Sequence, residues 1–134
     1  MKVTSDGALR AFYVVELFRS TGESEFPAQL MSIFLWIASH DGCRQEDLVK
    51  NCNISASSVS RNVTWLGPRH RLDHRSGLKL VRRERDPINH KAWRLYLTPR
   101  GKIFLNVLDQ ESMPQIKKTL EEVKALGQDD ENVG

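Results

Sequence analysis

The sequence has few of the features that membrane proteins, secreted proteins and metalloproteins require. No apolar run in its 134 residues approaches the roughly 20 residues of a membrane span. The amino terminus also lacks the apolar core of a signal peptide. Its only two cysteines, Cys43 and Cys52, have no C-x-x-C or other metal spacing. We therefore expect a cytoplasmic chain without membrane contact, whose thiols are reduced and buried, with a redox-sensing cysteine as the alternative.

Motifs of enzymes are also missing. The sequence has no glycine-rich phosphate loop, no H-E-x-x-H motif and no Cys-His cluster. His70 and His74 have the i, i+4 spacing of a metal pair on a helix, but no third ligand is evident nearby, so contact with solvent or phosphate is favoured. We expect neither catalysis, nor a metal, nor a cofactor.

Acidic residues are scarce in one long region. Between Arg61 and Lys102 the sequence has twelve basic residues and three acidic ones, a balance of +9, whereas the rest of the chain carries −6 and the whole chain +3. Such a regional excess is typical of a surface that meets phosphate. A solvated basic face is the alternative interpretation.

Apolar periodicity predicts helices in the first half of the chain. A helix over about residues 5–20 is apolar nearly all round, so we expect a second subunit to cover part of it. A second helix follows Pro27 and ends before Gly42. A short helix at about 44–50, a turn at 51–54 and a helix capped by Ser55 then form a helix-turn-helix.

The second half of the chain predicts a hairpin between helices. Alternating residues indicate strands at 78–85 and 91–97, and Thr98-Pro99 begins the next helix. A last helix starts at Ser112 and ends at about Leu126, before Gly127 and a disordered tail at 128–134.

The predicted fold is mainly α with a small β-hairpin. It is a winged helix-turn-helix in a single domain over 1–127, with a DNA-binding lobe at about 27–98 and dimerisation helices at about 5–20 and 99–126.

The second helix of the helix-turn-helix supplies candidates for reading DNA in the major groove. With Val59, Val63 and Leu66 facing inward, the polar candidates are Ser55, Ser57, Ser58, Ser60, Arg61, Asn62 and Thr64. Arg61 suits guanine because its fork matches O6 and N7, and Asn62 suits adenine or solvent. An ordinary polar helix surface is the alternative.

The hairpin and the loop before it supply candidates for phosphate contacts. The hairpin candidates are Arg82, Arg83, Arg85, Asn89, His90, Lys91 and Arg94, and the loop adds Arg69 and Arg71. Phosphate contacts give affinity and orientation without sequence information.

Four short segments carry a resemblance to a known family. They are Gln45-Glu46-Asp47-Leu48, Ile54-Ser55-Ala56-Ser57-Ser58-Val59-Ser60-Arg61, Leu80-Val81-Arg82-Arg83 and Leu97-Thr98-Pro99-Arg100-Gly101. In this order, from about Pro27 to Leu108, the chain resembles the MarR-type winged-helix regulators.

The resemblance implies a transcriptional regulator of double-stranded DNA. We expect a repressor that binds a near-palindromic operator as a homodimer, with an unidentified small aromatic molecule as effector. A winged-helix adaptor that binds another protein is the alternative, because fold does not fix function.

Two departures from the family pattern concern the wing. The segment from Gly67 to Gly77 is longer than the usual link to the wing, and Asn89-His90-Lys91 stands where an Asp-x-Arg arrangement is common. The family's arginine contact therefore carries over to Lys91 only as a charge, and the ion pair that would brace the wing is not carried over.

Overall fold

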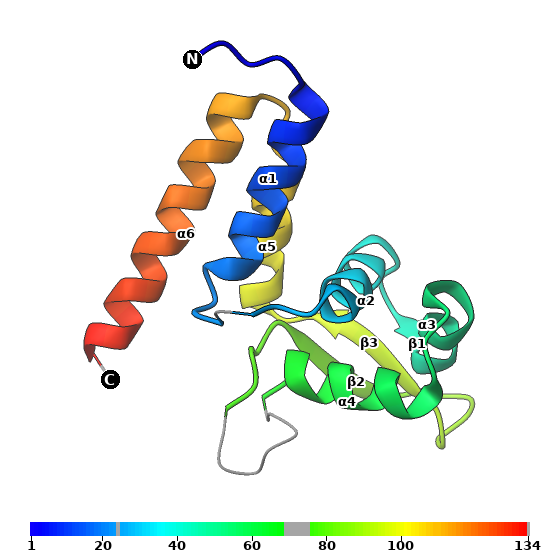
Figure 1. Ribbon diagram of the computed structural model, residues 1–134. Helices are drawn as coiled ribbons and strands as arrows, with labels where there is room; N and C mark the ends of the chain where they lie inside the picture. Colours follow the sequence, from blue (N-terminus) through cyan, green and yellow to red (C-terminus); the bar gives the residue numbers. More distant parts are fainter. Residues whose placement is uncertain (24, 69–75, 134) are drawn as a thin grey trace. The chain divides into compact units, whose positions relative to one another are not determined.

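The computed structural model describes residues 1–23, 25–68 and 76–133. Its elements, in chain order, are α1 (Asp6–Arg19), α2 (Ala28–Ser39), β1 (Cys43–Arg44), α3 (Gln45–Cys52), α4 (Ala56–Leu66), β2 (Val81–Arg85), β3 (Trp93–Leu97), α5 (Pro99–Leu108) and α6 (Met113–Val133) (Figure 1).

The chain divides into two compact units. The central unit is Pro27–Lys102, and the terminal unit combines Met1–Phe26 with Ile103–Gly134. The boundaries lie close to those predicted for the DNA-binding lobe and the terminal helices. That the two units act as a single domain stays a prediction.

The sheet of the central unit has one strand more than the sequence predicted. It is antiparallel with the order β1-β3-β2, and in the hairpin Arg83 lies opposite Leu95 and Arg85 opposite Trp93. On the other edge of β3, Cys43 of β1 also lies opposite Leu95. The two residues of β1 are too few to give an alternating pattern, which is why this strand was missed.

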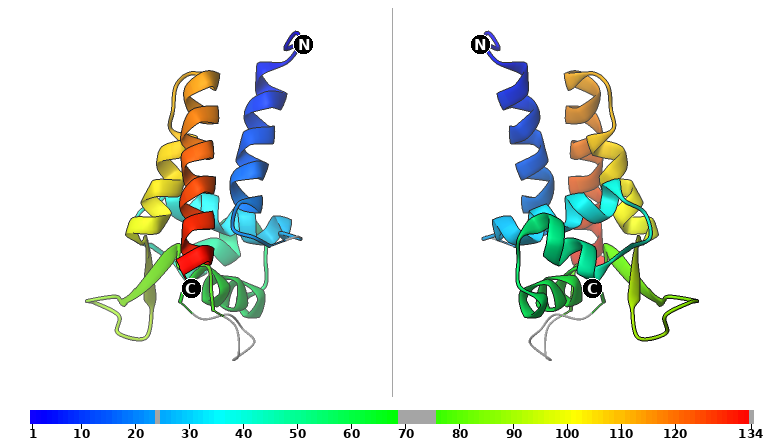
Figure 2. Two further views of the ribbon diagram at one scale, coloured as in Figure 1. Left: turned by 90° about the vertical axis from the view of Figure 1, so that its left-hand side faces the viewer. Right: turned by 90° about the vertical axis from the view of Figure 1, so that its right-hand side faces the viewer.

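The predicted winged helix-turn-helix is confirmed. The strands of the wing are shorter than the predicted ranges 78–85 and 91–97. Figure 2 shows β2 and β3 as a ribbon that projects beyond the helices of the central unit.

The helices of the central unit bury the apolar positions that the sequence spacing predicted. Apolar side chains recur three and four residues apart on α2 and α4, and alternate ones face inward on β3. Burying each such side chain contributes roughly 1.5–3 kcal/mol relative to leaving it in water. The fully buried ones include Leu30, Ile33, Phe34, Ile37, Leu48, Val59, Val63, Leu66, Leu80 and Leu95.

The start of α5 is anchored to the residues before β2. The Thr98 backbone N–H donates to the Leu80 carbonyl at 3.0 Å, and the Thr98 hydroxyl donates to the Lys79 carbonyl at 2.6 Å. Gly101 lies so close that a Cβ there would be 2.1 Å from the Leu80 oxygen. The glycine of the Leu97-Thr98-Pro99-Arg100-Gly101 segment is therefore needed for this close approach.

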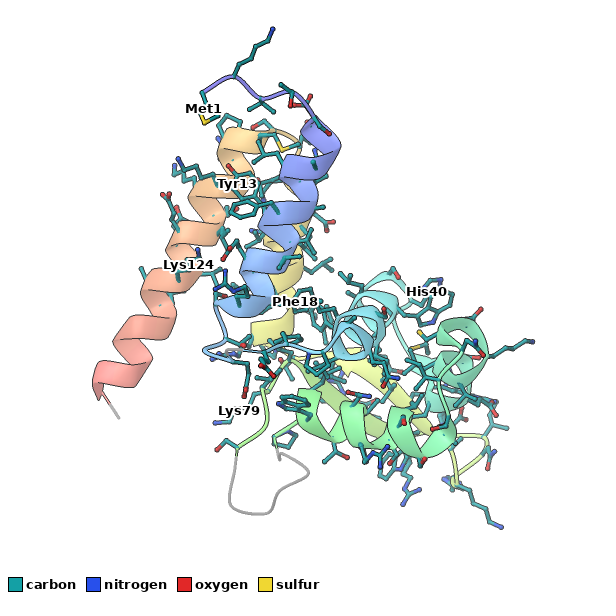
Figure 3. All side chains as sticks on the ribbon, in the orientation of Figure 1. Met1, Tyr13, Phe18, His40, Lys79 and Lys124 are labelled. Atoms are coloured by element: carbon teal, nitrogen blue, oxygen red, sulfur yellow. The ribbon has the colours of Figure 1, made fainter. Side chains whose placement is uncertain are left out.

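The terminal unit packs α1 beside α6. Figure 3 shows Tyr13 and Lys124 in the region between these helices, and Lys124 Nζ lies 4.0 Å from a Glu16 carboxylate oxygen. On α1 the side chains of Phe12 and Val15 are 52% and 42% exposed. The predicted helix is present, and a large part of its apolar surface is open in the single chain.

The last helix is longer than predicted. It runs from Met113 to Val133, so the predicted end near Leu126 was wrong and Gly127 lies inside the helix. The backbone of 128–133, which the sequence predicts as part of a disordered tail, is helical. Among the described residues, no helix has the length and apolar character to cross a membrane.

Candidate nucleic-acid interface

The turn before α4 has the geometry that the sequence predicted. Asn53 ends α3 in the left-handed region at φ 52°, and Ile54 is buried behind it. Ser55 caps α4, since its hydroxyl accepts from the Ser58 backbone N–H at 3.2 Å. This capping fixes where α4 begins and leaves its first turn exposed.

The outer face of α4 is short and polar. Ser57, Ser60 and Arg61 are exposed along it. The Arg61 guanidinium donates to Ser58 Oγ at 3.0 Å, so the arginine lies back along the first turn of its own helix. Small hydroxyl side chains beside a long cationic one allow close approach to a duplex and leave the guanidinium able to reach a base edge.

Asn62 and Thr64 face other parts of the central unit. Asn62 Nδ2 donates to the Ser58 carbonyl at 2.9 Å and lies 3.4 Å from Gln29 Oε1 on α2. Thr64 Oγ1 accepts from the Arg83 guanidinium at 2.7 Å. Both side chains are half-buried. The candidates for base contact that remain exposed on α4 are Ser57, Ser60 and Arg61.

Arg83 joins the wing to α4. Besides Thr64, its guanidinium reaches the Ser60 carbonyl at 3.5 Å. Burial lowers the pKa of Arg83, because desolvation disfavours the charged form. An arginine normally titrates far above neutral pH, so it stays charged and links β2 to α4 rather than lying free on the surface.

Two other wing arginines lie against aromatic rings. Arg82 is exposed with its guanidinium 4.6 Å from the centre of the Tyr96 ring, and it pairs with Glu84. Arg85 is exposed at 3.8 Å from the centre of the Trp93 ring and donates to the His90 carbonyl at 3.1 Å. Such contacts hold the long side chains in place while leaving N–H groups for phosphate.

Asp86 is a buried acid of the wing that accepts hydrogen bonds from several residues. Its carboxylate has no exposed surface, and its second oxygen accepts from Arg44 Nε at 3.0 Å and Arg94 Nε at 2.9 Å. The first oxygen accepts the backbone N–H groups of Ile88 at 2.8 Å and Asn89 at 3.1 Å. These backbone hydrogen bonds, aided by the two arginines, lower the pKa of Asp86 to about 2.

Arg94 therefore has internal partners. Its guanidinium contacts Asp86 and also donates to the Gly42 carbonyl at 3.0 Å, so it ties β3 to the residue before β1. The sequence had suggested a phosphate contact for Arg94, and the structure places it as a brace. The ion pairs of Asp86 with Arg44 and Arg94 therefore stabilise the wing, although the Asp-x-Arg arrangement is absent from the sequence.

The tip of the wing displays its remaining candidates to solvent. Asn89, His90 and Lys91 are exposed, and the Asn89 side chain accepts from the Lys91 backbone N–H at 3.2 Å. Arg69 and Arg71, and the histidines at 70 and 74, lie outside the described residues.

The interface has two residues that the sequence analysis did not single out. Arg44 looked like the first residue of a short helix, and Asp86 like part of a turn before Pro87. They are 42 residues apart in the chain. The one signal in the sequence is an acid in a region that has twelve basic residues and only two other acids, which favours an internal ion pair.

Of the two cysteines, Cys43 is buried and Cys52 is partly buried. Burial, with a smaller contribution from Asp47, raises the pKa of Cys43 to about 11, and burial also raises the pKa of Cys52. A high thiol pKa disfavours the reactive thiolate. Within the ranges that the structure describes, no three His, Cys, Asp or Glu side chains gather as metal ligands.

Comparison with known proteins gives structural likeness only. No family model and no curated protein matches the sequence. Among solved structures, a MarR transcriptional regulator from Methanosarcina mazei Go1 is 13% identical, with a TM-score of 0.55 over 96% of this chain and 94% of its own. MarR itself is 20% identical, with a TM-score of 0.54 over 90% and 75%. BpsR of Bordetella bronchiseptica is 16% identical, with a TM-score of 0.52 over 90% and 79%.

These likenesses cover nearly the whole chain and agree with the order of helices and strands. The chain therefore has the winged helix-turn-helix fold of the MarR-type transcriptional regulators.

Proposed function

We propose that this protein is a sequence-specific regulator of transcription that binds double-stranded DNA. The observation that carries the proposal is the exposed face of α4, where Ser57, Ser60 and Arg61 lie beside a wing that carries Arg82 and Arg85. A helix of this kind fits the major groove, and a hairpin beside it reaches the backbone or the next minor groove. The function is non-enzymatic and cytoplasmic.

The two elements have different roles in the proposal. Arg61, with Ser57 and Ser60, reads base edges from α4. Arg82, Arg85 and Lys91 meet phosphates, which orient the protein without reading sequence. Arg83 and Arg94 hold the wing in place through Thr64 and Asp86.

The remaining predicted contacts belong to the edges of the interface. Hydrogen bonds within the central unit stabilise α4 through the side chains of Ser55, Ser58, Asn62 and Thr64. The wing tip adds Asn89 and His90. Arg69 and Arg71 stay proposed phosphate contacts from the preceding loop.

We further propose that the working form is a homodimer joined through the terminal unit. The exposed Phe12 and Val15 on α1 support this, because a second copy would cover apolar surface that one chain leaves in water. Two copies would present two α4 helices to a near-palindromic operator, with half-sites about one helical turn apart. Bound there, the dimer represses by blocking access to the operator.

A small-molecule effector is part of the same proposal. DNA binding by BpsR, one of the structurally similar proteins, is regulated by 6-hydroxynicotinic acid. A panel of small aromatic acids, added to a complex of the full chain with DNA, tests whether any of them releases this protein.

The roles of Arg61 and Arg82 are separated by measuring affinity for a selected and a random duplex at several salt concentrations. Arg61→Ala should cost about 1–3 kcal/mol on the selected duplex alone, whereas Arg82→Ala should weaken both duplexes and reduce the salt slope by about 1. Lys2→Ala, an exposed change before α1 that also removes one positive charge, is the control and should alter neither.

Two results would contradict the proposal. If Arg61→Ala weakened both duplexes equally, Arg61 would be a phosphate contact and base reading would move to Ser57 or Ser60. If the unmodified protein bound no duplex at low salt, the alternative of a protein-binding adaptor would replace DNA binding.

A further inference from the structure

The wing tip carries an apolar side chain that the proposed function has not used. Ile88 is 87% exposed, more than any other large apolar residue described in the central unit. Single exposed apolar residues are common on protein surfaces, so this exposure alone predicts nothing. Ile88 differs from such residues because its backbone is held in place by hydrogen bonds.

Several backbone hydrogen bonds hold the wing tip between Asp86 and Ala92. Asp86 accepts from the backbone N–H groups of Ile88 and Asn89, and its own backbone N–H donates to the Ala92 carbonyl at 3.0 Å. The Ala92 N–H donates to the Asn89 carbonyl at 2.9 Å. Pro87, directly before Ile88, fixes one further backbone angle. The loop therefore presents Ile88 from an ordered backbone.

The same carboxylate anchors the tip to the rest of the central unit. Through Arg44 it is joined to β1 and through Arg94 to β3 and the Gly42 carbonyl. The Arg44 backbone N–H in turn donates to Asp47 on α3 at 2.8 Å. Asp86 thus links the position of the tip to the first helix of the helix-turn-helix.

The tip is within reach of the groove next to the one that α4 would occupy. Arg83 contacts α4, and Ile88 follows it by five residues, at most about 18 Å of extended chain. Half of a DNA helical turn is about 17 Å. Exposed donors on Asn89, His90 and Lys91 follow Ile88 in the sequence and suit the phosphates that border a minor groove.

We infer that Ile88 is an apolar wedge that enters the minor groove and opens a base step, with Asp86 as the residue that positions it. This inference rests on the proposed DNA-binding function. Apolar side chains at such positions partly unstack a step, and the flexible TA and CA/TG steps deform most easily. The wing thereby adds sequence preference at a position that no polar side chain reads.

The test uses the full chain and a set of duplexes that share the selected α4 site and differ only in the step beneath the wing. The unmodified protein should prefer a TA or CA/TG step over an A-tract by about tenfold. Ile88→Ala should abolish this preference and leave the salt slope unchanged. Lys91→Ala is the matched control from the same tip, and it should reduce the salt slope by about 1 and keep the preference.

A second readout detects the wedge directly. With 2-aminopurine at the step, binding of the unmodified protein should raise the fluorescence, and Ile88→Ala should not. Asp86→Asn, which keeps the shape of the side chain, should reduce both the fluorescence rise and the step preference while α4 still distinguishes the selected from a random site. Circular dichroism of each variant shows whether it is folded.

The outcomes separate the wedge from the function on which it rests. If the unmodified protein binds the selected duplex but neither step preference nor fluorescence differs in Ile88→Ala, the wedge is refuted and DNA binding stands. If the unmodified protein binds no duplex, both proposals fail.

Discussion

Replacing Gly101 by alanine tests whether the start of α5 is packed as the structure indicates. The new Cβ would be 2.1 Å from the Leu80 carbonyl oxygen, whereas real Cβ atoms essentially never come within 3.0 Å of such an atom. The backbone must therefore separate by about 0.9 Å at a point where Thr98 also donates to Leu80.

The expected loss of stability follows from three contributions. Overpacking costs about 1–3 kcal/mol, and weakening the Thr98 to Leu80 hydrogen bond costs about 1 kcal/mol. Alanine in place of glycine in a helix returns up to about 1 kcal/mol. The net destabilisation is about 1–3 kcal/mol, or a fall in Tm of about 4–12 °C for a chain of this size.

A second glycine provides the control. Gly7 also lies in the first turn of a helix, but a Cβ there would meet only the Ser5 hydroxyl at 4.0 Å. Gly7→Ala should therefore leave Tm unchanged or raise it slightly. Thermal unfolding followed by circular dichroism at one protein concentration compares the two variants. A Tm for Gly101→Ala at or above that of the unmodified protein would refute the reasoning.

The other predictions concern acid stability, thiol reactivity and assembly. Because its pKa falls from 3.8 to about 2 on folding, Asp86 stabilises the fold above pH about 4 and ceases to as pH falls through about 2. In urea unfolding at pH 7, Asp86→Asn should therefore have a lower free energy of unfolding than the unmodified protein. A difference in the free energy of unfolding that is as large at pH 2 as at pH 7 would contradict this role of Asp86. With a pKa of about 11, Cys43 should be alkylated at pH 8 about 100-fold more slowly than a thiol with the ordinary value of 9.0, and mass spectrometry showing it modified at the ordinary rate would contradict its burial. The double variant Phe12→Asp, Val15→Asp should sediment as a monomer at micromolar concentration. The control Ile88→Asp, outside the terminal unit, should leave the dimer intact. An unmodified protein that sediments as a monomer would overturn the dimer proposal.

Local sequence signals predicted most of the central unit. Ser55, Asn53 and Thr98 mark helix ends because capping and left-handed turns depend on single residue types. Val59, Val63 and Leu66 define the inner face of α4 because the helical period places them on one side. These inferences needed only neighbouring residues.

The features that the sequence did not predict depend on contacts between distant residues. Arg44 and Asp86 become partners only when β1 pairs with β3, and β1 is too short to be recognised. The sequence predicts a surface cation at Arg94, because alternation with Trp93 and Leu95 shows which side of the strand Arg94 occupies but not which residues it contacts there. Near the end of the chain, the sequence predicts that Gly127 terminates the last helix, whereas the helix continues through this glycine.

Recognition of a DNA sequence through α4 underlies the functional proposals for this chain. Selection of bound sequences from random duplexes, using the full unmodified chain, tests it most directly. We expect enrichment of a near-palindromic pair of half-sites about one helical turn apart, with loss of preference at one position in each half-site for Arg61→Ala. Recovery of sequences without any enrichment, or of no bound duplex even at low salt, would contradict it.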